Sequence, residues 1–533
     1  MHVFNRTRSS RIATALAAVL PLAGCGLVSE SGSGDERTIV VGTTSAPSVL
    51  DPAGAWDGSW ELYRNVYQTL LYYPSGSTSP QPDAAEKCEF TDTSSRTYRC
   101  TLKEGLKFSN GNALDAKAVK ASIDRIMTVA ENGVKTGPAG LLGSLDKVTT
   151  SGDLTVTFHL NKADTTFPFV LGSPATSLVD PEQYPADSLR EGNSIIGSGP
   201  YLLESYEKGA KSVLVKNPGY KGAADLENNG VTIRYFTDST KMVSALEDKD
   251  IDLILRGLTA EEIVELDSKG AKTEKKLALI EGTGAEIRYL VFNPKDARAN
   301  NPAVRKSVAQ IIDRDVIARE VYQGTVEPLY SMVPAGVAGH TTDFFDIFGD
   351  PDTQKAAEIL SDAGITAPVK LTLWYTTDRY GSSMATEFKE IKRQLDASGL
   401  FKITLKSSPW ADYQQSYQKG RFPVFGRGWF PDFPDPDNFI APFVGEQNAL
   451  GTPYDVPEIT DTLLPTSRKE ADRGAVTKQF ARAQEIIAED ARLIPIWQGK
   501  QYIAASQDIA GIENSLDPST IMQMWHLHRK TSW

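Results

Sequence analysis

Apolar and polar residues alternate along this chain with two different periods. The segment "LTVTFHL" at 154–160 places apolar residues at every second position, which is typical of a strand with one buried face. After Asp115, by contrast, Val119, Ile123 and Ile126 recur at helical spacing. Because aspartate is a favoured helix N-cap, this pattern predicts a helix that begins after Asp115 and buries that apolar face.

The same periods predict an alternation of strands and helices. Apolar positions at helical spacing predict a helix from residue 60 through Leu70, and another between Pro302 and Gly324, which are suitable start and stop residues. Strand, helix and strand follow one another over 231–255 and again over 286–408. This order is typical of α/β domains with partly parallel sheets, and it occurs twice. The sequence therefore predicts two α/β lobes.

The first residues indicate export. Three arginines precede the apolar run "IATALAAVLPLAGC" at 12–25, and this run is too short to remain as a membrane-spanning helix. We therefore predict a signal peptide over 1–24. The "LAGC" at 22–25 resembles a bacterial lipobox, and the resemblance implies cleavage before Cys25 and attachment of diacylglycerol to its sulfur. Ordinary signal cleavage beside a coincidental cysteine is the alternative.

The mature chain is expected to be a large acidic body on a tether. Residues 25–36 are rich in serine and glycine and predict a flexible linker. About 500 mature residues exceed a single core, so two or three domains are expected. Residues 1–24 contain three arginines and no acids, so their removal changes the net charge from −12 to −15. This acidic balance argues against nucleic acid as a partner.

Cysteine usage fits an exported protein. If Cys25 carries lipid, Cys88 and Cys100 remain, and they flank two short strand-like runs around a polar turn. A structural disulfide across this hairpin is the prediction, and two free thiols are the alternative.

The sequence gives little support for catalysis, a metal or a cofactor. It contains no GxSxG or HExxH motif and no further cysteine to act as a nucleophile. Of the five histidines only His526 and His528 are close together, and two ligands are too few for a metal site. An exported hydrolase that uses paired carboxylates stays open as an alternative.

The stretch "GWFPDFPDPDNF" at 428–439 combines aspartates, prolines and aromatic residues. Its prolines predict that it does not form a helix. It is also too apolar for an ordinary solvated turn. The interpretation is a stiff, extended loop that holds carboxylates and rings in place.

Seven motifs in one order make the chain resemble the peptide-binding (dipeptide and oligopeptide, family 5) solute receptors of bacterial ABC importers. The motifs are "LDP" at 50–52, "TLKEGLKFSNGNALDAKAV" at 101–119, "GSGPYLL" at 197–203, "KNPGY" at 216–220, "NPAVRKSVAQIIDRDVI" at 301–317, "AAEILSDAGI" at 356–365 and "GWFPDFPDPDNF".

This resemblance implies a periplasmic-binding-protein-like fold, with two α/β lobes, a hinge and an extra domain on the first lobe. The expected first lobe comprises 37–78, 195–285 and 500–533, with the extra domain at 79–194 and the second lobe at 286–499. The ligand would lie in the cleft between the lobes, and closure would trap it.

The resemblance also implies ligand-binding residues. Asp432 matches an aspartate that pairs with the ligand's α-ammonium group, and the alternative is a loop aspartate that caps local amides. Asp435 and Asp437 are assigned to turn structure. Main-chain groups near Gly428 and Phe430, and near Trp56, Asp57 and Gly58, are expected to line the ligand. Trp410 and Trp429 match tryptophans that wall side-chain pockets, and either ring could instead belong to the core.

The chain departs from the family pattern at the residues that bind the ligand's carboxylate. The arginines that oligopeptide receptors use for it fall on Tyr417 and Gly426 here. Arg379 lies where dipeptide-type members place an arginine that can bind a carboxylate in bidentate fashion, and a solvated surface arginine is the alternative. Strand alternation is expected to turn Arg427 away from the ligand.

The implied function is capture of peptides for an importer. The expected partners are a peptide ligand, separate ABC permease and ATPase chains, and the membrane through the lipid anchor. The chain is expected to act as a monomer, without nucleic acid. Alternatives are a member that binds a metal chelate, opine, sugar or antibiotic, and a degenerate surface scaffold.

Overall fold

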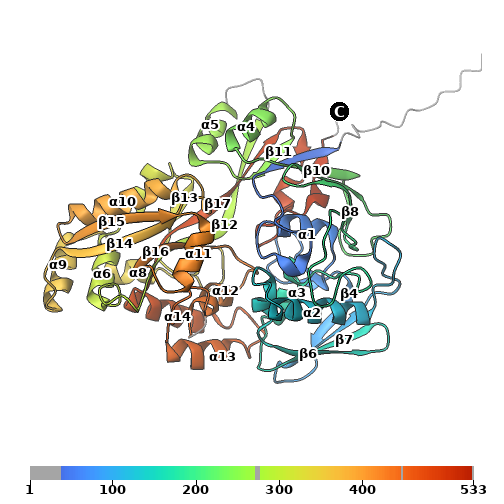
Figure 1. The fold of residues 1–533 in the computed structure, drawn as a ribbon, viewed down its shortest axis with the longest axis horizontal. Helices are drawn as coiled ribbons and strands as arrows, with labels where there is room; N and C mark the ends of the chain where they lie inside the picture. Colours follow the sequence, from blue (N-terminus) through green and yellow to red (C-terminus); the bar gives the residue numbers. More distant parts are fainter. Residues whose placement is uncertain (1–37, 271–276, 446–447, 531–533) are drawn as a thin grey trace, which may run out of the picture. The chain divides into compact units, whose positions relative to one another are not determined.

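Two long strands connect the two lobes of the protein (Figure 1). In the computed structural model, which describes residues 38–270, 277–445 and 448–530, β12 (Leu277–Phe292) pairs antiparallel with β17 (Leu493–Ser506) along almost its whole length. The far end of β12 pairs with β16, whereas the far end of β17 pairs with β11. One sheet with the order β15-β14-β16-β12-β17-β11-β1-β10-β9-β8 therefore runs through both lobes.

The first lobe is built on the β11–β8 side of this sheet. Its apolar core packs α1 and the end of the chain, including Trp525, against the sheet. A smaller cluster under α4 includes Met242 and Ile251. The elements are β1 (Ile39–Thr43), α1 (Trp60–Val66), β8 (Tyr201–Glu207), β9 (Lys211–Lys216), β10 (Gly230–Tyr235), α4 (Ser239–Glu247), β11 (Leu253–Arg256), α5 (Ala260–Gly270), β18 (Ile509–Ala510) and β19 (His528–Arg529).

The extra domain has its own antiparallel sheet, with the order β4-β5-β7-β6, and its own core. Cys88 and Cys100 lie opposite each other on β4 and β5 and are joined by a disulfide. Its elements are β2 (Leu71–Tyr72), β3 (Gln81–Pro82), β4 (Ala85–Phe90), β5 (Thr97–Leu102), α2 (Ala116–Glu131), β6 (Leu145–Ser151), β7 (Thr155–Leu160) and α3 (Phe167–Leu171).

The second lobe has apolar cores on both faces of its part of the sheet. On β12, Leu290 and Phe292 belong to the core shared with α6, α9 and α10, whereas Tyr289 and Val291 belong to the core shared with α11 and α14. The elements are α6 (Pro302–Ile311), α7 (Arg314–Val316), β13 (Val326–Pro328), α8 (Asp343–Phe348), α9 (Thr353–Asp362), β14 (Val369–Thr376), α10 (Met384–Ala397), β15 (Phe401–Ser408), α11 (Trp410–Gln418), β16 (Val424–Trp429), α12 (Asp437–Ile440), α13 (Leu464–Ser467) and α14 (Thr477–Asp490).

Some element boundaries differ from those expected. The helix predicted after Asp115 is confirmed, since the Asp115 carboxylate accepts the Ala118 N–H at the start of α2. The helix predicted from residue 60 ends at Val66, so Leu70 lies outside it. The helix predicted from Pro302 is interrupted because Ile312 is extended and Asp313 caps a new turn.

The predicted domain boundaries at residues 285 and 499 fall inside β12 and β17, which run through both lobes. The predicted signal peptide (1–24), the tether (25–36) and the lipidation site Cys25 lie outside the described residues. No helix in the described ranges is both long and apolar enough to cross a bilayer.

The proline-rich loop after β16 is fixed from two sides. Phe433 is buried in the core of the extra domain, with its ring centroid 6.2 Å from that of Phe169. The extra domain's Thr165 also contacts the second lobe, because its N–H bonds to the carbonyl of Arg468 at 3.0 Å. The prediction that 428–439 is not helical is wrong for its last residues, since α12 begins at Asp437 directly after Pro436, where a helix tolerates proline.

Two ion pairs hold the same loop from within the second lobe. Arg473 binds the Asp435 carboxylate through two bonds of 2.7 and 2.9 Å, and Arg468 binds Asp437 through bonds of 2.7 and 2.8 Å. Asp435 also accepts the Asp437 N–H, which confirms a turn role for it. Both carboxylates are buried, and each is paired with an arginine whose charge offsets the cost of that burial.

We expect Arg473→Met to lower the free energy of unfolding by about 3–5 kcal/mol, because it leaves the buried Asp435 carboxylate without its cation. Chemical denaturation measures this change. The control is Arg482→Met, which removes two solvent-exposed pairs, with Glu458 and Glu485, and should change the free energy of unfolding by less than about 1 kcal/mol. Equal effects of the two substitutions would contradict the assigned role of Arg473.

Candidate functional site

A cavity of about 840 Å³ lies between the two lobes. The first lobe contributes Asp57, Gly58 and the segment 255–260, and the second lobe contributes Arg288, the segment 377–383 and Phe430. The part of β17 from Gly499 to Tyr502, next to the crossing between the lobes, completes the wall. Because both lobes and the connecting strands form this cavity, a change in the angle between the lobes changes the cavity.

The lining carries charges of both signs. The acids are Asp57, Glu286 and Asp378, and the bases are Arg256, Arg288, Arg379 and Lys500. Among the bases, three are paired with a carboxylate: Arg256 with Glu61, Lys500 with Glu281, and Arg288 with Glu286. Such a wall suits a ligand that itself carries both charged and apolar groups.

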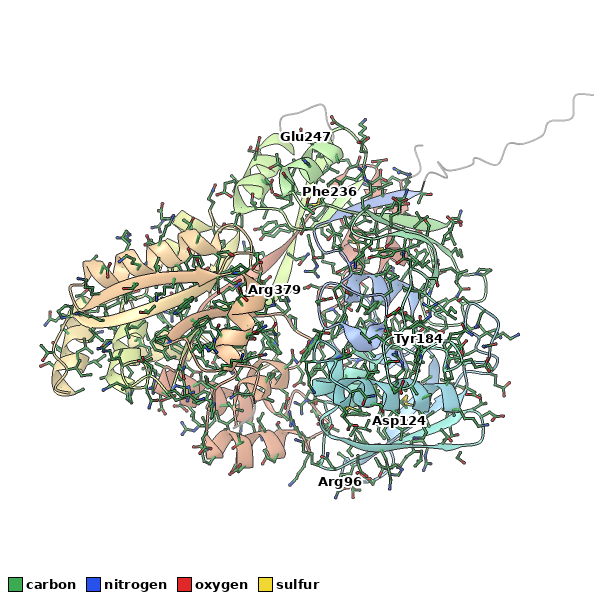
Figure 2. The ribbon with its side chains drawn as sticks, in the orientation of Figure 1. Arg96, Asp124, Tyr184, Phe236, Glu247 and Arg379 are labelled. Atoms are coloured by element: carbon green, nitrogen blue, oxygen red, sulfur yellow. A yellow bond between two sulfur atoms is a disulfide. The ribbon has the colours of Figure 1, made fainter. Side chains whose placement is uncertain are left out.

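Arg379 differs from the other bases. Within the described residues, the contact recorded for its guanidinium is with the Trp410 ring, 5.4 Å away, and it has no carboxylate partner. Figure 2 labels Arg379 at the side of the second lobe that lies toward the first lobe. Its donors are therefore available to an anionic group in the cavity.

Four of the predicted site residues line this cavity, namely Asp57, Gly58, Phe430 and Arg379. Phe430 is 40% exposed, which is unusual for so large an apolar side chain and offers a surface for an apolar group of a ligand. The Asp57 carboxylate accepts the Ser59 N–H at 2.8 Å and so also orders its own turn.

Asp432 lies next to the cavity and not on its wall. Its side chain is buried and accepts hydrogen bonds from Trp56 Nε1 at 2.5 Å and Asn438 Nδ2 at 2.9 Å. Trp56 belongs to the first lobe, so this bond joins the two lobes at a point where the neighbouring residues Asp57 and Phe430 do line the cavity.

The Asp432 carboxylate is buried, and no basic side chain in the described part of the chain pairs with it. Burial raises its pKa to about 6, and the bonds from Asn438 and Trp56 oppose this shift. Asn438 also accepts the Asp432 N–H and the Trp429 Nε1–H, so it fixes the loop around the carboxylate. A cation beside this carboxylate would offset the free-energy cost of burying its negative charge.

The two predicted tryptophans pack beside the cavity but do not line it. Trp429 is 9% exposed and meets Trp56 edge to face, with ring centroids 6.3 Å apart. Trp410 is half-buried and contacts Arg379 and Tyr380. In this structure Trp429 packs against Trp56, and Trp410 packs against Arg379.

Gly428 faces an arginine that sequence reasoning missed. Gly428 and Arg288 are cross-strand neighbours, and a Cβ atom at Gly428 would lie 1.9 Å from Arg288 Nη1. The Arg288 side chain therefore occupies the space beside Gly428, where the ligand main chain was expected. The available signal was the basic residue between apolar neighbours in "EIRYLVFN", because a charge inside a buried strand needs a partner or a function.

Arg427 does not line the cavity, in agreement with the prediction that strand alternation turns it away from the ligand, and its side chain is buried. Its guanidinium lies 4.4 Å from the centroid of the Tyr417 ring, on the opposite side of the strand from Gly428. In the described residues, no group of three or more potential metal ligands comes together.

Residues 79–451 match the family described as bacterial extracellular solute-binding proteins, family 5 Middle. The chain belongs to this family. It is therefore an extracytoplasmic solute-binding protein, with the two lobes, hinge and extra domain of the periplasmic-binding-protein fold.

Curated relatives cover nearly the whole chain. A probable D,D-dipeptide-binding periplasmic protein from Escherichia coli is 26% identical over 89% of this chain and 90% of its own length. The heme-binding protein A of Haemophilus influenzae is 26% identical over 94% of this chain and 96% of its own length. These relatives are binding proteins.

Solved structures share the fold. A periplasmic binding protein from Helicobacter pylori, in complex with the peptide STSA, has a TM-score of 0.78 at 22% identity and covers 92% of this chain and 98% of its own. A dipeptide-binding protein from Pseudoalteromonas, in complex with Met-Leu, has a TM-score of 0.78 at 20% identity and covers 93% of this chain and all of its own.

The raised pKa of Asp432 predicts a pH-dependent stability. The folded protein takes up a proton as the pH falls through about 6, whereas the unfolded aspartate does so near 3.8. The contribution of Asp432 to the free energy of unfolding is therefore most favourable below pH 4, and it is lost as the pH rises to about 6. Relative to that of the Asp432→Asn variant, the free energy of unfolding of the unmodified protein should fall by about 2–3 kcal/mol between pH 4 and pH 7.

Urea denaturation of both proteins at several pH values measures this difference. A constant offset from pH 4 to pH 7 would mean that Asp432 titrates normally and is not held in an apolar environment.

Proposed function

We propose that this protein is a receptor that binds peptides in the cavity between its lobes and delivers them to the permease of an ABC importer. The observation that carries the proposal is the placement of two unpaired charges. Among the residues that the structure describes, the buried Asp432 carboxylate beside the cavity has no basic partner, and the Arg379 guanidinium on the cavity wall has no carboxylate partner. A peptide with free ends carries the complementary ammonium and carboxylate groups.

The relatives support this choice of ligand. The E. coli relative is named for dipeptide binding, and two solved structures of the same fold contain peptides. The relative named for heme binding makes a non-peptide solute the second candidate. The lining favours a peptide, because three carboxylates and four basic side chains face the cavity and suit a ligand of alternating polar and apolar groups.

Binding of the ammonium group would replace a contact between the lobes. In the structure, Trp56 Nε1 donates a hydrogen bond to one of the Asp432 carboxylate oxygens. A ligand ammonium about 4 Å from this carboxylate gains roughly 4 kcal/mol at an effective dielectric constant near 20. The carboxylate is already buried and fixed by Asn438, so little of this gain is lost in ordering it.

The proposed cellular arrangement follows from the family and the N-terminal sequence. Cleavage before Cys25 and its lipidation would hold the mature chain at the outer face of the cell membrane through the flexible tether. The permease and ATPase would be separate chains, and the receptor would act as a monomer. It needs no cofactor and catalyses no reaction in this role.

The proposal predicts selection for a free amino terminus. By isothermal titration calorimetry, N-acetylation of a short peptide should weaken binding to the unmodified protein by about a hundredfold, because a charged hydrogen-bond partner of Asp432 is lost. Asp432→Asn should weaken binding of the free-amine peptide by a similar factor and should remove the discrimination against the acetylated one.

The control is Asp461→Asn, which changes an exposed aspartate of the same lobe and should bind both peptides as the unmodified protein does. Equal affinity of the unmodified protein for free and acetylated peptides would assign Asp432 a structural role only.

A further inference from the structure

Arg288 is a buried cation on the wall of the cavity. Arg288 is only 3% exposed, yet it is one of the residues that line the cavity between the lobes. Three aromatic rings surround the guanidinium, whose central carbon lies 4.0 Å from the ring centroid of Tyr380, 4.9 Å from that of Trp497 and 5.7 Å from that of Phe430. This packing holds the guanidinium plane in one place.

The hydrogen-bonding capacity of this guanidinium is only partly used. Nη2 pairs with the Glu286 carboxylate, and Nη1 reaches the main-chain oxygen of the neighbouring Ile287 at 3.3 Å. Nε is buried and has no partner within the described part of the chain. Because an arginine has five N–H donors and buried donors are normally satisfied, Arg288 has capacity for a further acceptor.

The strand beside Arg288 makes room for this arrangement. Gly428 is the cross-strand neighbour of Arg288, and any Cβ atom there would collide with Nη1. Glycine at 428 therefore allows the guanidinium to lie across β16 at the cavity.

Other buried arginines also have unpartnered nitrogen atoms, but in different surroundings. These are Arg64, Arg314, Arg427 and Arg492. None of them lines the cavity between the lobes. Among these arginines, the combination of an unpartnered donor and a place on the wall of a ligand-sized cavity is thus specific to Arg288.

We propose that Arg288 binds a carboxylate of the ligand. This inference rests on the proposed function and narrows the ligand to peptides that present an anionic group at this wall. An arginine fork matches a carboxylate in geometry and charge, and a desolvated site strengthens the contact. With Arg379 on the same wall, the cavity has two guanidinium groups for anions, and the carboxylate at Arg288 is either the C-terminal one or an acidic side chain.

The test uses Arg288→Met and four peptides, Ala-Glu, Ala-Gln and their C-terminally amidated forms, in calorimetric titrations. Arg288→Met should weaken binding of the peptide that carries the recognised carboxylate by about tenfold or more, and binding of the peptide that lacks it by less than about twofold. If amidation removes the effect of the substitution, the C-terminal carboxylate is bound. If replacing glutamate by glutamine in the peptide removes the effect of the substitution, the glutamate side chain is bound.

Two further variants separate binding from folding. Arg427→Met removes an equally buried arginine on the other side of β16 and should leave the affinities unchanged, whatever it does to the melting temperature. Glu286→Gln removes the negative charge beside Arg288 and should strengthen binding of carboxylate-bearing peptides.

The outcomes also distinguish this inference from the proposed function. If the unmodified protein binds these peptides but Arg288→Met weakens all four equally or none, Arg288 is a structural residue and peptide binding stands. If the unmodified protein binds no peptide of any kind, the proposed function fails and the inference fails with it.

Discussion

The buried carboxylate of Asp432 is the constraint on which the proposed binding site depends. An ionised carboxylate in such a place is costly unless a cation accompanies it, and here Trp56 and Asn438 supply only neutral donors. The loop around it is fixed by Phe433 in the core of the extra domain and by the Asp435–Arg473 pair. Such a fixed, uncompensated carboxylate is suited to a positively charged ligand group that arrives between the lobes.

The connecting strands place a positive charge on the wall of the cavity. β12 and β17 run through both lobes, so Arg288 on β12 and Trp497 on β17 lie where the lobes meet. Arg379 follows β14 of the second lobe and lies on the same wall. The fold thus positions guanidinium groups on rigid strands or directly after them, and this lowers the entropy cost of binding a carboxylate.

Local patterns predicted the two α/β lobes, the capped helix α2 and the non-helical start of the loop at 428–439, because these depend on residues close in sequence. Contacts between distant residues were not predictable in the same way. Trp56 and Asp432 are 376 positions apart, and the pairing of Arg288 with Gly428 depends on strand register. The break at Ile312 was missed because the apolar periodicity continues across it, whereas the Asp313 cap begins a new turn.

A crystal structure of the mature protein with a bound peptide would show whether the Asp432 carboxylate binds the ligand's ammonium group. We expect a peptide in the cavity between the lobes, with its ammonium group within hydrogen-bond distance of the Asp432 carboxylate and with Trp56 Nε1 moved away from that oxygen. A complex in which the Trp56–Asp432 bond stays intact and the peptide's amino terminus lies elsewhere would contradict this expectation.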